Sequence, residues 1–139
     1  HQRLEDTMAS LPEPPCNPFS ITAFETGYRQ GGHWLKGMMA YVGGNRDLAM
    51  AFLAQQVPEL KAIDPQGSYL LWLDCRGLGL DDEALKAFFV HQAGVGLSPG
   101  RQFGHQGRGF MRMNLATPRV TLEQALNQIH QAVAAHRNR

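Results

Sequence analysis

Two short apolar runs limit the folds open to this chain more than any other feature. Residues 69–75 ("YLLWLDC") and 110–116 ("FMRMNLA") are bounded by turn residues and are too short for helices, so both are predicted to be strands. A third short strand is expected at 95–100 ("VGLSPG"). Segments with helical periodicity surround these runs, at 18–30, 33–56, 82–92 and 121–137. This order predicts an α/β chain of the α+β kind, with a small mixed sheet covered by helices on one face.

The N-terminal part of the chain differs from the rest. The proline-rich stretch "PEPPCNP" (12–18) interrupts any helix, and Asn17 followed by Pro18 is a typical helix start. We expect residues 1–32 to be an N-terminal arm and helix, the remnant of a larger neighbouring domain, and residues 33–139 to form a C-terminal small αβ domain. Because the chain begins with a histidine and opens within a helical pattern, we also expect it to be a fragment.

Composition narrows the class of protein. Hydrophobic residues make up 43% of the chain and charged residues 18%, which is typical of a globular domain. A net charge of +1 predicts no nucleic-acid surface, and no apolar run is long enough to predict a membrane span. Two distant cysteines, Cys16 and Cys75, suggest no disulfide framework and favour the cytoplasm. The six histidines are scattered without helical ligand spacing, so no metal site is expected.

Arg112 is the candidate functional residue, because it lies inside an apolar strand. Strand alternation places Arg112 with Phe110 and Asn114 on one face, and the flanking Met111 and Met113 on the core face. From the pattern alone, Arg112 is equally compatible with a solvated arginine and with a bidentate clamp for a ligand carboxylate. No role is assigned to Arg119, which lies beyond the strand.

Other candidate groups have simpler interpretations. The glycine-rich stretch 101–109 lacks a P-loop pattern and is not followed by a helix, so Arg101 and Arg108 are expected to be solvated. Asp74 and Arg76 are interpreted as a structural ion pair, and Cys75 between them as a small buried hydrophobe rather than a nucleophile.

Several stretches taken together resemble one family. They are "SYLLWLDCRGLGL", "FFVHQAGVGLSPGRQFG", "GFMRMNLATPRVTLEQAL" and "NPFSITAFETGYRQGGHWLKGMMAYVGGNRD". The chain resembles, from about Asn17 to about Val133, the C-terminal part of the MalY/PatB-type C–S lyases (cystathionine β-lyase-like). These are pyridoxal 5'-phosphate (PLP) enzymes of fold type I, in the class I/II aminotransferase superfamily. The resemblance implies that this chain is the small C-terminal domain with a preceding helical arm.

The resemblance also implies a function for the full-length protein and a role for Arg112. The arginine of the matching motif binds the substrate α-carboxylate, so Arg112 is expected to be substrate-binding, with Asn114 as a lesser contributor. The implied reaction is α,β-elimination on cystathionine or a cysteine S-conjugate, which gives pyruvate, ammonia and a thiol. The alternatives are a class I/II aminotransferase and, from a different class, a stand-alone binding or regulatory domain.

The same resemblance limits what this chain can do alone. The family's PLP-binding lysine lies upstream of the matched segment, and none of the chain's three lysines (Lys36, Lys61, Lys86) has its sequence context. We therefore expect no catalytic and no cofactor-binding residue here, and an inactive fragment. The expected partners are the missing large domain, a second copy in a full-length homodimer, and other fragments by self-association; neither nucleic acid nor a membrane is expected.

Overall fold

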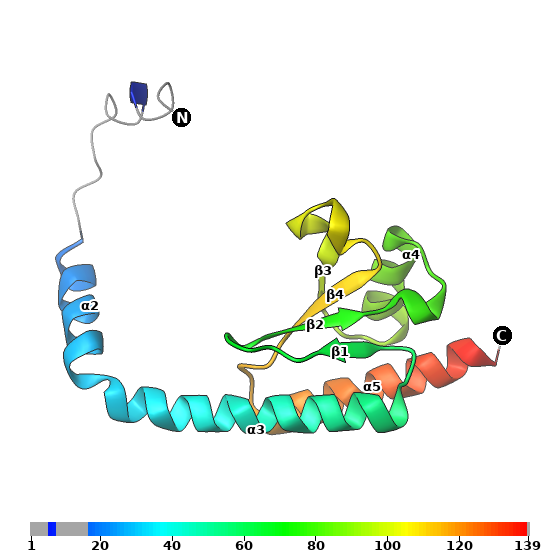
Figure 1. Ribbon diagram of the computed structural model, residues 1–139, viewed down its shortest axis with the longest axis horizontal. Coiled ribbons are helices and arrows are strands. Elements are labelled where there is room, and N and C mark those ends of the chain that lie inside the picture. The colour runs from blue at the N-terminus through cyan, green and yellow to red at the C-terminus, as the bar shows by residue number, and fades with distance from the viewer. Residues whose placement is uncertain (1–5, 8–16, 139) are drawn as a thin grey trace. The chain divides into compact units, whose positions relative to one another are not determined.

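The computed structural model describes residues 6–7 and 17–138 and divides the chain into two compact units, His1–Met38 and Met39–Arg139 (Figure 1). The division falls within helix α3, Gly32–Gln56, which runs from one unit into the other. The expected boundary between residues 32 and 33, and the origin of the N-terminal part in a larger domain, stay predictions. The proline-rich stretch up to residue 16 lies outside the described residues.

Helix α2, Pro18–Gln30, begins as the sequence predicts. The side chain of Asn17 accepts a hydrogen bond from the Phe19 N–H at 3.0 Å, and Pro18 occupies the first helical position. This helix buries none of its residues, and Phe19, Phe24 and Tyr28 are all largely exposed. Within the described part of the first unit, its apolar side chains therefore lack the packing that normally stabilises an amphipathic helix.

The second unit contains one four-stranded antiparallel sheet. Its strands are β1 (Lys61–Ile63), β2 (Leu70–Asp74), β3 (Ser98–Pro99) and β4 (Phe110–Asn114), in the order β1-β2-β4-β3. The prediction of a mixed sheet is therefore wrong. The links between β1 and β2 and between β3 and β4 are too short for the crossover that a parallel pair requires, so both pairs are antiparallel.

The helices and turns follow the predicted order with shifted bounds. Helix α4, Asp82–Ala87, is capped by the Asp81 side chain, which accepts from the Ala84 N–H at 2.8 Å, and it continues as a π-helical turn, Phe88–Gln92. The last helix, α5, spans Arg119–Arg137. Short 3₁₀ turns occur at Arg76–Leu78, Gly100–Phe103 and His105–Gly107.

The core lies between one face of the sheet and the helices. In Figure 1, α5 runs beside the part of α3 that belongs to the second unit, and the His130 ring and the Gln56 carbonyl are 3.0 Å apart. The inward-facing strand side chains are fully buried, as are those that meet them from α3, α5 and the turn after α4: Leu71, Leu73, Met111, Met113, Leu53, Leu126, Ile129, Phe88 and Phe89. Within the described residues of the second unit, no helix covers the opposite face of the sheet (Figure 1). Within the described residues, no helix has the length and apolarity needed to cross a bilayer.

Candidate functional site

A row of four side chains crosses the uncovered face of the sheet. The strand register aligns Ile63 with Trp72, Trp72 with Arg112, and Arg112 with Ser98. Arg112 is half-buried, whereas Met111 and Met113 on either side of it are buried, so the predicted alternation is confirmed. Arg112 therefore lies near the middle of the exposed face rather than at its rim.

The guanidinium of Arg112 is held by an aromatic ring. Its central carbon lies 4.2 Å from the centroid of the Phe103 ring, a cation–π distance. One guanidinium nitrogen is 3.5 Å from the hydroxyl of Ser98, at the limit of a hydrogen bond. Among residues 6–7 and 17–138, Arg112 forms no ion pair with a carboxylate. The side chain is thus positioned while most of its N–H donors remain available.

A second arginine on this face, Arg76, differs from Arg112 because its guanidinium donors are occupied by a carboxylate. Arg76 lies over the Phe110 ring at 5.1 Å, but its guanidinium donates to both carboxylate oxygens of Asp74, at 2.9 and 2.6 Å. Hydrogen bonding from Arg76 lowers the pKa of the Asp74 carboxyl, against the effect of partial burial. The predicted structural pair is confirmed, and its donors are not free for a ligand.

Trp72 connects the two arginine–aromatic contacts. Its ring meets the Phe103 ring edge-to-face, with centroids 5.6 Å apart, and the Phe110 ring in the same manner at 6.2 Å. The sequence predicted the strand that carries Trp72 but not this cluster. Alternation does place Trp72 outward, whereas Phe103 comes from a loop with no periodic signal.

The glycine-rich loop brings Phe103 over the sheet by a close backbone approach. A Cβ on Gly100 would lie 2.3 Å from the Gly107 carbonyl oxygen, and a Cβ on Gly107 would lie 2.1 Å from that of Gly100. Only glycines permit this contact, which closes the loop upon itself. Arg101 and Arg108 are exposed, as predicted.

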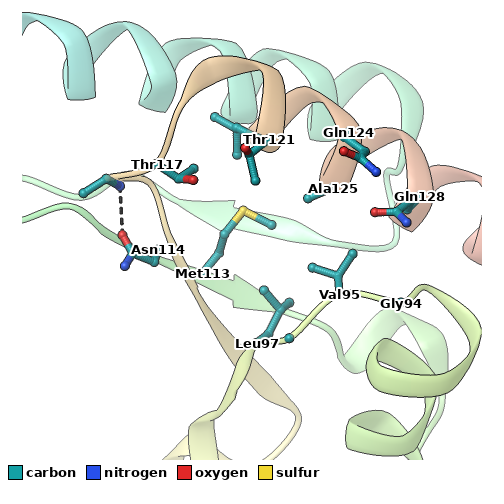
Figure 2. A pocket seen from close by; sticks show the side chains of 13 residues that line it. Gly94, Val95, Leu97, Met113, Asn114, Thr117, Thr121, Gln124, Ala125 and Gln128 are labelled. Atoms are coloured by element: carbon teal, nitrogen blue, oxygen red, sulfur yellow. Dashed lines mark hydrogen bonds between the residues drawn. The ribbon is translucent and has the colours of Figure 1, made fainter.

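Asn114 shares the outward face but has a local partner. Its side-chain oxygen accepts a hydrogen bond from the Ala116 N–H at 2.8 Å, which fixes the turn after β4 (Figure 2). Its amide NH₂ and the second lone pair of its oxygen are left to meet a ligand. The lesser role in substrate binding stays a prediction.

A cavity of about 490 Å³ lies away from Arg112, between α5, the end of β4 and residues 94–97 (Figure 2). Figure 2 shows Thr121, Gln124 and Gln128 of α5 facing Leu97 and Met113 across it. None of its lining residues is charged. It therefore offers no counter-ion for a charged amino acid, and the Arg112 face is the better candidate.

Sequence reasoning missed a polar network that explains Arg119. Asn45, in α3, is fully buried and donates to the carbonyls of Leu115 and Thr117, both at 2.9 Å. Its side-chain oxygen accepts from Arg119 at 3.1 Å, and the Arg119 N–H donates to the Tyr41 hydroxyl at 2.7 Å. Arg119 is thus structural, and this network joins the segment after β4 to α3.

Cys75 is buried, and burial raises the pKa of its thiol from 9.0 to about 12, with a further contribution from the Asp74 charge. We expect Cys75 to react slowly with a thiol reagent in the folded chain and quickly in urea, measured in a Cys16→Ser variant that has no other thiol. Rapid labelling of the native chain would contradict the burial of Cys75.

The raised pKa of Cys75 also makes the stability of the chain depend on pH. Between pH 9 and pH 12 the unfolded thiol ionises and the folded one does not. The free energy of unfolding should therefore fall as the pH rises through this window.

The residues present do not fit a covalent PLP site. That cofactor requires a lysine in an enclosed pocket, and Lys36, Lys61 and Lys86 are all exposed. In the described part of the chain, no group of three or more His, Cys, Asp or Glu side chains is arranged to hold a metal ion. The available guanidinium donors of Arg112 suit an anion, and a carboxylate or a phosphate matches their planar geometry.

Comparisons with known proteins agree with this fold. The chain is 38% identical over 118 residues to cystathionine β-lyase PatB of Bacillus subtilis and 36% identical over 118 residues to protein MalY of Escherichia coli. Each alignment covers 85% of this chain and 30% of the relative. The structure of cystalysin from Treponema denticola, which contains PLP, matches with a TM-score of 0.84 and 32% identity, over 87% of this chain and 31% of that one. No protein-family model matches the chain.

The helices and the small antiparallel sheet of this chain match a portion of the structures of fold type I PLP-dependent enzymes. Among these enzymes, the partial match is to the MalY/PatB cystathionine β-lyases, and it covers their C-terminal part. The recognition made from the sequence is confirmed. The chain spans about 30% of the length of the curated relatives named above.

Proposed function

We propose that this chain supplies the carboxylate-binding side of the active site in a PLP-dependent C–S β-lyase. The observation that carries the proposal is the state of Arg112, which is held by Phe103 and lacks a carboxylate partner among the described residues. A positioned guanidinium with available donors suits an incoming carboxylate. The cofactor and its lysine would come from a part of the protein outside this chain.

The substrate class follows from the relatives and not from the geometry of this chain. PatB carries the name cystathionine β-lyase, which supports an amino acid with a sulfur leaving group, either cystathionine or a cysteine S-conjugate. In this proposal Arg112 binds the α-carboxylate and fixes the orientation of the amino acid. A substrate held in the reactive orientation reacts faster. The cytoplasmic location and the full-length homodimer stay predictions.

An activity assay on the full-length protein tests the proposal. We expect cystathionine to yield pyruvate without any added 2-oxo acid, and the 139-residue chain assayed alone to yield none, because its lysines are exposed. Amino-group transfer that depends on a 2-oxo acid would instead identify an aminotransferase. If the chain binds an amino acid and the full-length protein catalyses neither elimination nor amino-group transfer, a stand-alone binding domain would be favoured.

A further inference from the structure

We infer that Phe103 is a positioning residue for Arg112, and that it holds the guanidinium in place without occupying its hydrogen-bond donors. The inference rests on the proposed carboxylate-binding role of Arg112. It adds a residue from a different segment, the glycine-rich loop, whose contribution to substrate affinity would be indirect.

The chemistry of the contact supports this role. A phenyl ring attracts a cation through the negative charge of its face and has no acceptor atom. Phe103 can therefore restrain Arg112 at 4.2 Å without itself engaging any of the five N–H donors. The Ser98 hydroxyl, at 3.5 Å, engages one nitrogen at most weakly. A carboxylate in the place of Phe103 would also have restrained the arginine, but it would have competed with the ligand.

Arg76, on the same face of the sheet, is an arginine restrained by a carboxylate. It has an aromatic ring beneath it as well, that of Phe110, but its donors are bonded to Asp74. The two arginines thus differ in the partner that fixes them. Arg76 is anchored by an anion and Arg112 by a neutral ring, which is the arrangement that an anion-binding residue requires.

Phe103 is itself held from two sides. The Trp72 ring meets it edge-to-face at 5.6 Å, and Trp72 is the cross-strand neighbour of Arg112. The close approach of Gly100 and Gly107 fixes the path of the loop that carries Phe103. Phe103 remains 49% exposed, so its replacement removes little buried surface. A change in Arg112 after this replacement would therefore not be explained by loss of the fold.

The first test is an NMR measurement on the isotope-labelled 139-residue chain. The Arg112 Nε–H signal, assigned from an Arg112→Lys variant, should be shifted upfield by the Phe103 ring and should show restricted motion. In Phe103→Leu the signal should move to an ordinary arginine position and become mobile, whereas Phe103→Tyr should preserve both properties. Phe110→Leu is the matched control, because it removes the other aromatic neighbour of Trp72 and should leave the Arg112 signal unchanged.

The second test uses the full-length enzyme. We expect Phe103→Leu to raise KM roughly three- to tenfold with little change in kcat, and Phe103→Tyr to restore KM. The inference is overturned if Phe103→Leu leaves the Arg112 signal in place, or if it leaves KM unchanged while loss of Arg112 raises it. The proposed function fails on different evidence, namely if loss of Arg112 itself has no effect on KM.

Discussion

Replacing Arg112 with methionine in the full-length enzyme is expected to raise KM and to lower kcat/KM by at least about tenfold, because a charge-assisted bidentate pair contributes roughly 1.5–3 kcal/mol. Methionine keeps most of the apolar stem and removes the charge, so the change isolates the guanidinium. Steady-state kinetics with cystathionine measure the effect. Arg112→Lys should recover only part of the loss, since an ammonium lacks the planar pair of donors.

Arg76→Met is the matched control for this prediction. It removes a guanidinium from the same face of the sheet and from a comparable position over an aromatic ring, at 5.1 Å from the Phe110 centroid. Because Arg76 is already bonded to Asp74, its loss should change KM less than about twofold while lowering stability slightly. Equal kinetic losses in the two variants, or unchanged kinetics in Arg112→Met, would remove Arg112 from the site.

Local patterns in the sequence were sufficient for the elements that define the site. Alternation along β4 put Arg112 on the face opposite Met111 and Met113, and the start of α2 followed from Asn17 and Pro18. Both results depend on residues a few positions apart. The family was also recognised from the sequence, because several motifs along the chain resemble the same family.

The features that the sequence did not predict depend on distant residues. Strand β1 has only three residues and no distinct periodicity, and it exists because it pairs with β2. The position of Phe103 depends on the meeting of Gly100 and Gly107, which no local pattern indicates. Asn45 reads as one polar residue inside a long helix, and its partners lie 70 or more positions further along the chain.

Asn45→Ala is expected to destabilise the 139-residue chain by about 2–3 kcal/mol, because it leaves the carbonyls of Leu115 and Thr117 without their donor in or near the core. A buried carbonyl that loses its partner keeps its desolvation cost, whereas an exposed one bonds to water instead. The Leu115 carbonyl bond is buried and the Thr117 bond is partly buried, so most of the loss should come from the former. Urea unfolding of the original chain and of the Asn45→Ala variant measures the difference, provided that the free energy of unfolding depends on urea concentration with the same slope in both.

Asn127→Ala separates the effect of burial from the effect of losing an asparagine. The Asn127 side chain also donates to a backbone carbonyl at 2.9 Å, that of Glu123, but it does so on the exposed surface of α5. Its loss should therefore cost less than about 0.5 kcal/mol. A similar cost in both variants would mean that water replaces Asn45 at the Leu115 carbonyl. A large difference would instead identify Asn45 as the residue that fixes the segment after β4 against α3, and with it the end of the strand on which Arg112 is placed.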